Sequence, residues 1–224
     1  MDLVRSAFHL LHNSTQRKHF FRWLESLKMD YFLNKKQPWL VFDAIDFLNS
    51  LPLENKRVFE YGSGGSTLYW LSRNMLSVSV EHDPGWFELV RVHLEISMEM
   101  DYRLVQPQKS VAKVSLDIAD PLLYLSGDTR FQGYNFKNYA SQIDTFPDEY
   151  FDVVLVDGRA RPACIMHSAP KVKVNGLLIL DNADRSYYTQ KAGSFMRNYS
   201  CLPLYGVGPA GYQMWGTSIY MRQK

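Results

Sequence analysis

A short apolar run, an acid and a glycine-rich turn stand together at residues 58–71, which read VFEYGSGGSTLYWL. The run Val58-Phe59 is typical of a buried strand, and Ser66-Thr67 after the glycines is typical of a helix start. Glycines let the backbone bend sharply and let a ligand come closer than a Cβ would allow. Unpaired N–H groups in the first helical turn offer donors to that ligand. The stretch therefore predicts a strand–turn–helix unit that binds a nucleotide-like ligand in an α/β protein.

Two features distinguish this turn from the G-x-G-x-x-G fingerprint of dinucleotide-binding proteins. Thr67 stands where the third glycine is expected, and Glu60 precedes the first glycine, Gly62, by two residues. A pyrophosphate gains nothing from a negative charge at that position. A carboxylate there suits a ligand that carries a cation, such as the amino group of a methionine moiety.

A second apolar run, residues 76–81, also ends in an acid. This acid, Glu81, lies 21 residues beyond Glu60. In βαβ nucleotide sites an acid about 20 residues beyond the turn accepts hydrogen bonds from the ribose hydroxyls. Two carboxylates at this spacing are a more specific signal than either one alone.

The pattern acid-x-Gly-x-Gly at residues 60–64 resembles the first motif of the class I S-adenosylmethionine-dependent methyltransferases. The resemblance implies S-adenosyl-L-methionine as cofactor, with Glu81 on its ribose and His82 or Asp83 on its adenine. It also implies that the methionine part lies against the glycine-rich turn, whose residues are Glu60, Tyr61, Gly62, Ser63, Gly64, Ser66 and Thr67.

Two later strands are expected to end in acids as well. Residues 151–156 are continuously apolar apart from Asp152 and lead into Asp157, and residues 177–180 lead into Asp181-Asn182. In a parallel sheet Glu60, Glu81, Asp157 and Asp181 would all meet at one edge. Charges gathered there cost desolvation without helping the core, which favours a binding site over a folding device.

The remaining elements fit the same family. Helices are expected over residues 2–51, with Pro38 in a first turn, and they cover one sheet face and one side of the ligand site. Further elements are expected as strand 102–105, a helix from Pro84 through Ile96, a helix from Arg161, a turn at Asn175-Gly176, a helix over 187–199, and an antiparallel pair, 201–205 and 215–221. This order is similar to the methyltransferase Rossmann-like fold. It implies a mostly parallel seven-stranded sheet with an antiparallel last strand, helices on both faces and an N-terminal helical extension. The domain would span residues 56–224, with residues 1–55 as its helical flank.

The acids after the fourth and fifth strands also resemble those of the metal-dependent caffeoyl-coenzyme A type O-methyltransferases. Asp157, Asp181 and Asn182 match the positions that bind a divalent cation in that family, so they are the candidate catalytic residues. A cation there would lower the pKa of a hydroxyl and orient it. Arg159 and Arg161 could instead pair with the same aspartates, or Asp157 could line the methionine site. The sequence therefore leaves the metal open without favouring it.

Composition limits the partners. A net charge of +2 over 224 residues gives no reason to expect nucleic acid or an anionic membrane. Two cysteines and no signal-peptide pattern indicate a cytoplasmic protein. His9, His12 and His19 are expected on helix surfaces, because no acid joins them at ligand spacing.

The function expected from these features is methylation of a small molecule, at a hydroxyl oxygen, with oligomerisation left open. The aperiodic segment 106–138 is either a lid over the substrate or a decorative insertion. A nicotinamide-dependent oxidoreductase is the rival enzyme, disfavoured by Thr67 and Glu60. A binding module that keeps the fold without turnover is the alternative from another class.

Overall fold

The computed structural model describes residues 2–28, 31–94, 100–110, 117–211 and 213–224. Within these residues the main sheet has seven strands in the order β3-β2-β1-β6-β7-β9-β8. The strands are β1 (Arg57–Tyr61), β2 (Leu76–Glu81), β3 (Met100–Leu104), β6 (Phe151–Val156), β7 (Val172–Asp181), β8 (Tyr199–Gly206) and β9 (Trp215–Arg222). Strands β3, β2, β1, β6 and β7 pair in parallel, while β9 runs antiparallel to both of its neighbours. The predicted fold class is confirmed.

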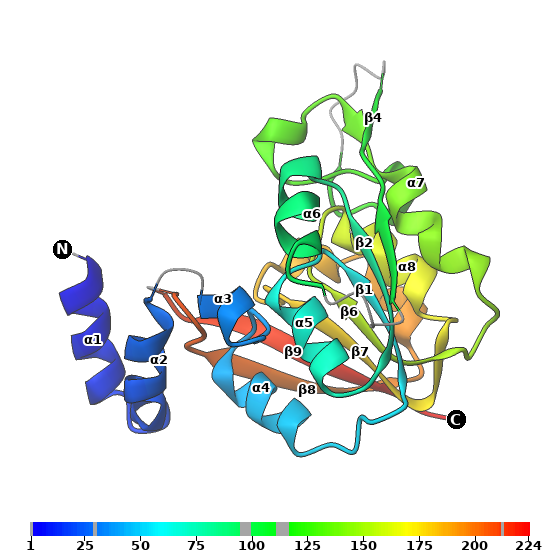
Figure 1. Ribbon diagram of the computed structural model, residues 1–224. Helices are drawn as coiled ribbons and strands as arrows, with labels where there is room; N and C mark the ends of the chain where they lie inside the picture. The colour runs from blue at the N-terminus through cyan, green and yellow to red at the C-terminus, as the bar shows by residue number, and fades with distance from the viewer. Residues whose placement is uncertain (1, 29–30, 95–99, 111–116, 212) are drawn as a thin grey trace.

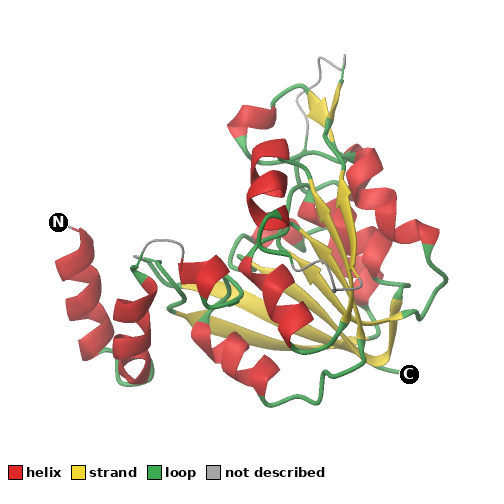
Figure 2. Cartoon of the chain, viewed as in Figure 1, coloured by secondary structure: helices red, strands yellow, loops and turns green. Residues whose placement is uncertain are grey.

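Helices cover both faces of this sheet (Figures 1 and 2). One face carries α4 (Phe42–Asn49) and α5 (Gly65–Ser72), with α6 (Pro84–Arg91) towards the β3 edge. The other face carries α7 (Lys137–Ala140) and α8 (Arg161–Ser168). A two-layer cover explains why the central strands are apolar along their whole length rather than alternating.

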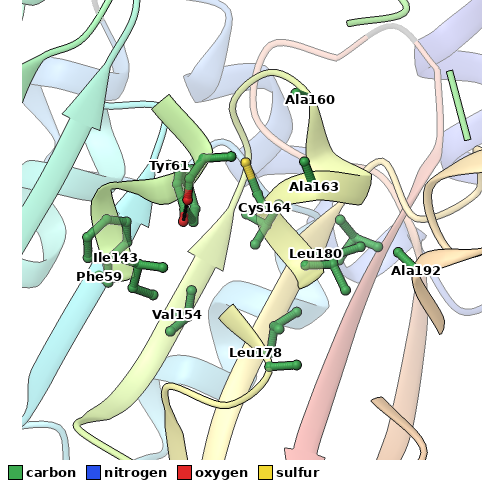
Figure 3. Close-up of a cluster of buried hydrophobic side chains, with 14 of the residues drawn as sticks. Phe59, Tyr61, Ile143, Val154, Ala160, Ala163, Cys164, Leu178, Leu180 and Ala192 are labelled. Atoms are coloured by element: carbon green, nitrogen blue, oxygen red, sulfur yellow. Dashed lines mark hydrogen bonds between the residues drawn. The ribbon is translucent and has the colours of Figure 1, made fainter. Parts of the chain in front are cut away.

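Alternate residues of the strands feed two separate cores. Phe59 and Tyr61 of β1 belong to the core on the α8 side, where Figure 3 shows them with Cys164. Val58 belongs to the core beneath α4 and α5. Successive side chains of a strand point to opposite faces, so Glu60 must point the same way as Val58, into the layer beneath α5.

The N-terminal flank consists of α1 (Asp2–His12), α2 (Phe20–Ser26) and α3 (Tyr31–Asn34), with a short 3₁₀ turn between α1 and α2. Figure 1 shows α1 and α2 beside the β8–β9 end of the sheet. The indole of Trp23 is buried, and its Nε1 donates to the carbonyl of Gly211 at 2.7 Å. The side-chain oxygen of Gln16 accepts from the backbone N–H of Val207 at 3.0 Å. These bonds fix the flank to the β8–β9 loop.

Two expected helices differ from the structure. Pro38 is not in a helix, because α4 begins at Phe42 and Val41 before it is extended, with φ −60° and ψ 144°. Residues 187–199 form no α-helix but two 3₁₀ turns, Ser186–Tyr188 and Ala192–Met196. Gly193 and Ser194 within this stretch are weak helix formers.

Two further expectations need correction. Asn175-Gly176 is not the turn before a strand but lies inside β7, where the register against β6 shifts. Asn175 takes a left-handed φ of +63° there, a bulge rather than a break. The helix after Glu81 ends at Arg91, and the predicted end at Ile96 lies outside the described residues.

His19 is not a surface residue. It is 4% exposed, and its Nε2 lies 3.1 Å from Oδ1 of Asp43 on α4. With Asp46 these groups come within 4.8 Å of one another, as metal ligands would. Lys18 at 2.6 Å from Asp43 and Arg22 at 2.5 Å from Asp46 already neutralise both acids. The cluster therefore joins the flank to α4.

Candidate functional site

A cavity of about 1480 Å³ opens at the carboxyl ends of the parallel strands. Strand β1 lies between β2 and β6, so the chain leaves neighbouring strands β1 and β6 in opposite directions. Such a reversal leaves a crevice at the strand ends, where open α/β sheets bind ligands. The inner wall is made of residues at or after strand ends, namely Gly62, Ser63, Glu81, His82, Asp157, Gly158, Asp181 and Asn182.

The outer wall comes from α1, α2, the segment between α3 and α4, the facing ends of β8 and β9 with their loop, and the connections after β3, β6 and β7. It is rich in aromatic and basic side chains, namely Arg5, His9, Trp23, Trp39, Arg130, Phe131, Arg159, Arg185, Tyr205 and Trp215. Helix α1 thus lines one side of the site, as expected of the flank. The outer wall brings together segments from opposite ends of the chain, as Arg5 and Trp215 show.

The glycine turn is tight for a steric reason. Gly62 has a φ of +88°, which favours glycine, and a Cβ there would come within 2.9 Å of Cα of Gly158. A Cβ on Gly65 would come within 2.1 Å of the carbonyl oxygen of Gln37. Gly62 therefore lets β1 and β6 approach at the cavity floor, while Gly65 lets the backbone after α3 approach α5.

Glu81 connects the end of β2 to this turn. Its Oε2 accepts from the backbone N–H and the hydroxyl of Ser63, both at 3.0 Å. Its Oε1 accepts from the backbone N–H groups of His82 at 2.7 Å and Asp83 at 2.9 Å. Burial on its own raises the pKa of Glu81, but the neighbouring His82 and these backbone donors outweigh burial, so the pKa is lowered. Glu81 is thus an ionised acceptor at the edge of the cavity.

Glu60 lies elsewhere. It is one residue short of the end of β1, is 1% exposed and is not part of the cavity wall. Its carboxylate accepts from the hydroxyls of Thr67 at 2.5 Å and Ser79 at 2.7 Å, and from Nε1 of Trp70 at 3.2 Å. Burial raises the pKa of Glu60 to about 6. The four acids therefore do not share one rim, because strand alternation turns Glu60 under α5.

Several other residues of the predicted cofactor site lie behind the cavity wall. The hydroxyl of Tyr61 donates to the carbonyl of Ala140 on the α8 side, and the hydroxyl of Thr67 accepts from the N–H of Gly64 at 2.9 Å. Ser66 is buried within the first turn of α5. These residues shape the turn from beneath, and direct contact with a cofactor stays a prediction for them.

Asp83 and Gly64 meet through a residue that the sequence did not single out. The carboxylate of Asp83 caps α6 by accepting from the N–H of Trp86 at 2.8 Å. The Trp86 indole then donates to the carbonyl of Ser63 at 2.7 Å, and a Cβ on Gly64 would lie 3.7 Å from its ring. Trp86 therefore lies over the turn at the cavity edge.

Asp157 follows β6, Asp181 is the last residue of the neighbouring strand β7, and the two acids share one arginine. Nη2 of Arg161 donates to Oδ1 of Asp157 at 2.8 Å, and Nη1 lies 4.0 Å from Oδ2 of Asp181. Burial and the charge of Asp181 raise the pKa of Asp157 well above its usual value, against the pull of Arg161. Burial also raises the pKa of Asp181, again opposed by Arg161. The two carboxyls take up protons more readily than free aspartates.

The segment 106–138 contributes part of the wall. Its described residues include the short ribbon of β4 (Gln108–Lys109) and β5 (Tyr134–Asn135) and two 3₁₀ turns. From this segment Phe131 packs edge-on against the His82 ring, with 5.2 Å between ring centres, and lines the cavity. A position beside the cavity suits a lid, whose movement stays a prediction.

The sequence did not identify Trp215, on the outer wall, as a site residue, because its position depends on the register between β7 and β9. Its Nε1 donates to Oδ1 of Asp181 at 2.9 Å, and the hydroxyl of Thr217 donates to the same oxygen at 2.8 Å. Thr217 pairs directly with Asp181 across the antiparallel β7–β9 ladder. Sequence alone gave the two strands but not this pairing. Gly158, directly after Asp157, packs against Gly62 and was not singled out from the sequence either.

Comparisons with known proteins identify the fold. The chain aligns with a putative O-methyltransferase from Klebsiella pneumoniae at 15% identity, over 90% of each chain, with a TM-score of 0.56. It aligns with the O-methyltransferase from Bacillus cereus in complex with SAH at 16% identity, over 91% of each chain, with a TM-score of 0.55. A cofactor-bound structure of Rv0187 from MTB matches at 16% identity over 97% of this chain and 95% of that one, with a TM-score of 0.53.

No protein-family model matches the sequence, and no curated protein is similar to it. At these identities the solved structures show a shared fold, the methyltransferase Rossmann-like sheet. Function has to be argued from the site.

Proposed function

We propose that the protein is an S-adenosylmethionine-dependent methyltransferase that acts on a small molecule at a hydroxyl oxygen. The observation that carries this proposal is Glu81, an ionised acid fastened to the glycine turn beside a cavity of about 1480 Å³. Ligand pockets of roughly 300–1,000 Å³ hold one drug-sized molecule. This cavity has room for a cofactor and a second small molecule, and the shared fold supports the same assignment.

The residues at the inner wall fit the cofactor. The space above Gly62 and Ser63 would hold the methionine part, Glu81 the ribose, and His82 with Asp83 the adenine. Each carboxylate oxygen of Glu81 already accepts two hydrogen bonds. A ribose hydroxyl that binds Glu81 would therefore displace the Ser63 hydroxyl from Oε2. That hydroxyl lies 2.7 Å from the hydroxyl of Tyr102, which keeps it satisfied after the exchange.

The chain's part in the reaction is positioning and the transfer of one proton. S-adenosylmethionine supplies a methyl group that its positive sulfur already activates, so alignment of the acceptor provides much of the rate. Oδ1 of Asp157 is held by Arg161, and no side chain among the described residues donates to Oδ2. We assign Oδ2 as the atom that receives the hydroxyl proton, because a raised pKa makes a carboxylate a stronger base.

We also place the protein in the cytoplasm. Cys164 is buried and Cys201 exposed, and both are free thiols, as a reducing compartment would keep them. Among the described residues no helix has both the length and the apolar character to cross a bilayer.

The test is calorimetric titration with S-adenosylhomocysteine and, separately, with NAD⁺. Binding of the first and not the second is expected, and the reverse would favour the oxidoreductase alternative. Labelled methyl transfer to a library of hydroxylated small molecules then separates an enzyme from a binding module. Cofactor binding without transfer to any acceptor would favour the module.

A further inference from the structure

Arg161 occupies the place between the two carboxylates at which a divalent cation would lie. Asp157 and Asp181 stand at the carboxyl ends of neighbouring parallel strands, as a pair of oxygen ligands for one ion would. Arg161 stands in the first turn of α8, directly above both strand ends, and is 5% exposed. The sequence does not decide whether a cation or an arginine neutralises the two aspartates, and the position of Arg161 in the structure favours the arginine.

The guanidinium is held on every side. Nε donates to the carbonyl of Gly158 at 3.0 Å, and Nη2 donates to both the carbonyl and Oδ1 of Asp157 at 2.8 Å. Nη1 donates to the carbonyl of Asp181, and the group lies 5.1 Å from the ring centre of Tyr188. A side chain fixed at three backbone carbonyls cannot move aside without leaving them unpaired in the interior.

The oxygens that remain do not make a cation site. Oδ1 of Asp181 already accepts from Trp215 and Thr217. Oδ2 of Asp181 lies 4.0 Å from the guanidinium, which stays charged at every relevant pH. Mg²⁺ needs close octahedral coordination and Ca²⁺ needs six to eight oxygens. Asp157 and Asn182 on the cavity side could offer only part of such a set, beside a fixed positive charge.

We propose that Arg161 is a built-in counter-ion that replaces the divalent cation, so this chain orients its acceptor with Asp157 and needs no metal. The role of Asp157 rests on the function proposed above, whereas the exclusion of the cation rests on Arg161 alone. Arg161 contacts no reacting atom in this scheme. It is a positioning residue that fixes Oδ1 of Asp157 and directs Oδ2 to the cavity.

The direct test is titration of the wild-type protein with Mn²⁺, followed by the electron paramagnetic resonance signal of the free ion. No site that depends on Asp157 is expected, and neither Mn²⁺ nor EDTA should shift the melting temperature. One Mn²⁺ bound per chain and lost in Asp157→Asn would overturn the proposal. Binding that persists in Asp157→Asn lies elsewhere and leaves the proposal standing.

The converse test removes the arginine. Arg161→Met leaves two buried carboxylates without a counter-charge, so its melting temperature should fall and should then rise with added Mn²⁺. If the Arg161→Met protein folds and its melting temperature does not rise with Mn²⁺, the proposal that Arg161 replaces a cation is contradicted. Arg161→Lys keeps the charge without the planar fork, so it should melt lower than wild type and remain insensitive to Mn²⁺. If Arg161→Met does not fold, the wild-type titration and Arg161→Lys still decide.

Arg222→Met is the matched control. Arg222 is also a largely buried arginine that donates to backbone carbonyls, those of Pro170 and Val172, but it lies on β9 away from the cavity. Its loss should lower stability without creating any response to Mn²⁺. Calorimetry with S-adenosylhomocysteine in EDTA separates the two proposals. Cofactor binding together with an Asp157-dependent ion would refute the metal inference and leave the proposed function standing. Absence of both cofactor binding and such an ion would refute the proposed function, and with it the role of Asp157 towards the acceptor, while the exclusion of the cation by Arg161 would stand.

Discussion

The indole Nε1 of Trp86 donates to the carbonyl oxygen of Ser63 at 2.7 Å, which brings the first turn of α6 onto the glycine turn after β1. The two residues belong to successive βα units, and Asp83 fixes the helix start from which Trp86 reaches over. Trp86 is 38% exposed and lines the cavity. A ligand above Ser63 must therefore contact or displace this ring.

The first prediction uses Trp86 as an optical reporter. Titration with S-adenosylhomocysteine should change the tryptophan fluorescence of the wild type, because the ligand alters the surroundings of the indole. Trp86→Phe should lose most of that change. Trp39→Phe is the control, since Trp39 lies on the outer wall, stacked on Phe32 with 4.3 Å between ring centres. An equal loss in both variants would show that Trp86 is not the ring nearest the cofactor.

Glu81→Ala should weaken cofactor binding by roughly ten- to a hundredfold, the loss of hydrogen bonds to a charged acceptor. Calorimetry with S-adenosylhomocysteine and with its 2′-deoxy and 3′-deoxy analogues distinguishes the two effects of this change. If the variant only loosens Ser63, the binding affinity for all three ligands should fall by the same factor. Loss of the ribose contact should make the deoxy analogues no weaker than the parent in the variant. If the deoxy analogues still bind more weakly than the parent ligand by the same factor as in the wild type, Glu81 does not contact the ribose.

Tyr139 and Gly158 offer a test of the cavity floor. The Tyr139 hydroxyl is buried without a hydrogen-bond partner among the described residues, and a Cβ on Gly158 would lie 1.9 Å from it. Gly158→Ala should lower the free energy of unfolding by roughly 1–3 kcal/mol through overpacking. Tyr139→Phe removes an unsatisfied hydroxyl and should cost little.

The double variant Gly158→Ala with Tyr139→Phe should be more stable than the sum of the single changes, as measured by urea unfolding. Additive effects would mean that the main clash of the Ala methyl group is not with the hydroxyl. It would then lie at Cζ of Tyr139 or at the N–H of Gly62, which are 3.0 Å and 3.1 Å from the same Cβ position.

Glu60 should make stability depend on pH. Its ordinary pKa is 4.5 and burial raises the folded-state pKa to about 6, so the folded chain holds the proton more tightly. The contribution of protonated Glu60 to the free energy of unfolding is fully present below about pH 4.5 and is lost as the pH rises through about 6. The difference corresponds to roughly 2 kcal/mol of unfolding free energy.

Glu60→Gln is the variant that isolates this contribution. Urea unfolding over a pH series should show the variant gaining stability relative to wild type between about pH 4.5 and 6. The hydroxyls of Thr67 and Ser79 can rotate to accept from the amide, so the variant should fold. Glu88→Gln, at an exposed position on α6, should follow the wild-type curve. A constant difference between Glu60→Gln and wild type across this range would place the titration on another group.

The sequence by itself determined the sheet and its binding edge. Short apolar runs rich in β-branched residues, such as 151–156, are typical of buried parallel strands, and an acid at or after the last residue of such a strand, such as Asp157, reaches the carboxyl edge of the sheet. The spacing of Glu81 from the glycine turn placed it beside Ser63 because one βα unit has a nearly fixed length. These are local properties, set by a few neighbouring residues.

Only the tertiary structure decided how the acids are used. Glu60 is turned into the interior because it sits one residue before the end of β1, and strand alternation is sensitive to a single position. Arg161 reaches both Asp157 and Asp181 because α8 begins directly above two adjacent strands. Trp215 reaches Asp181 through an antiparallel register. Each of these contacts depends on the relative placement of separate elements, which packing across the whole chain fixes and which no local pattern encodes.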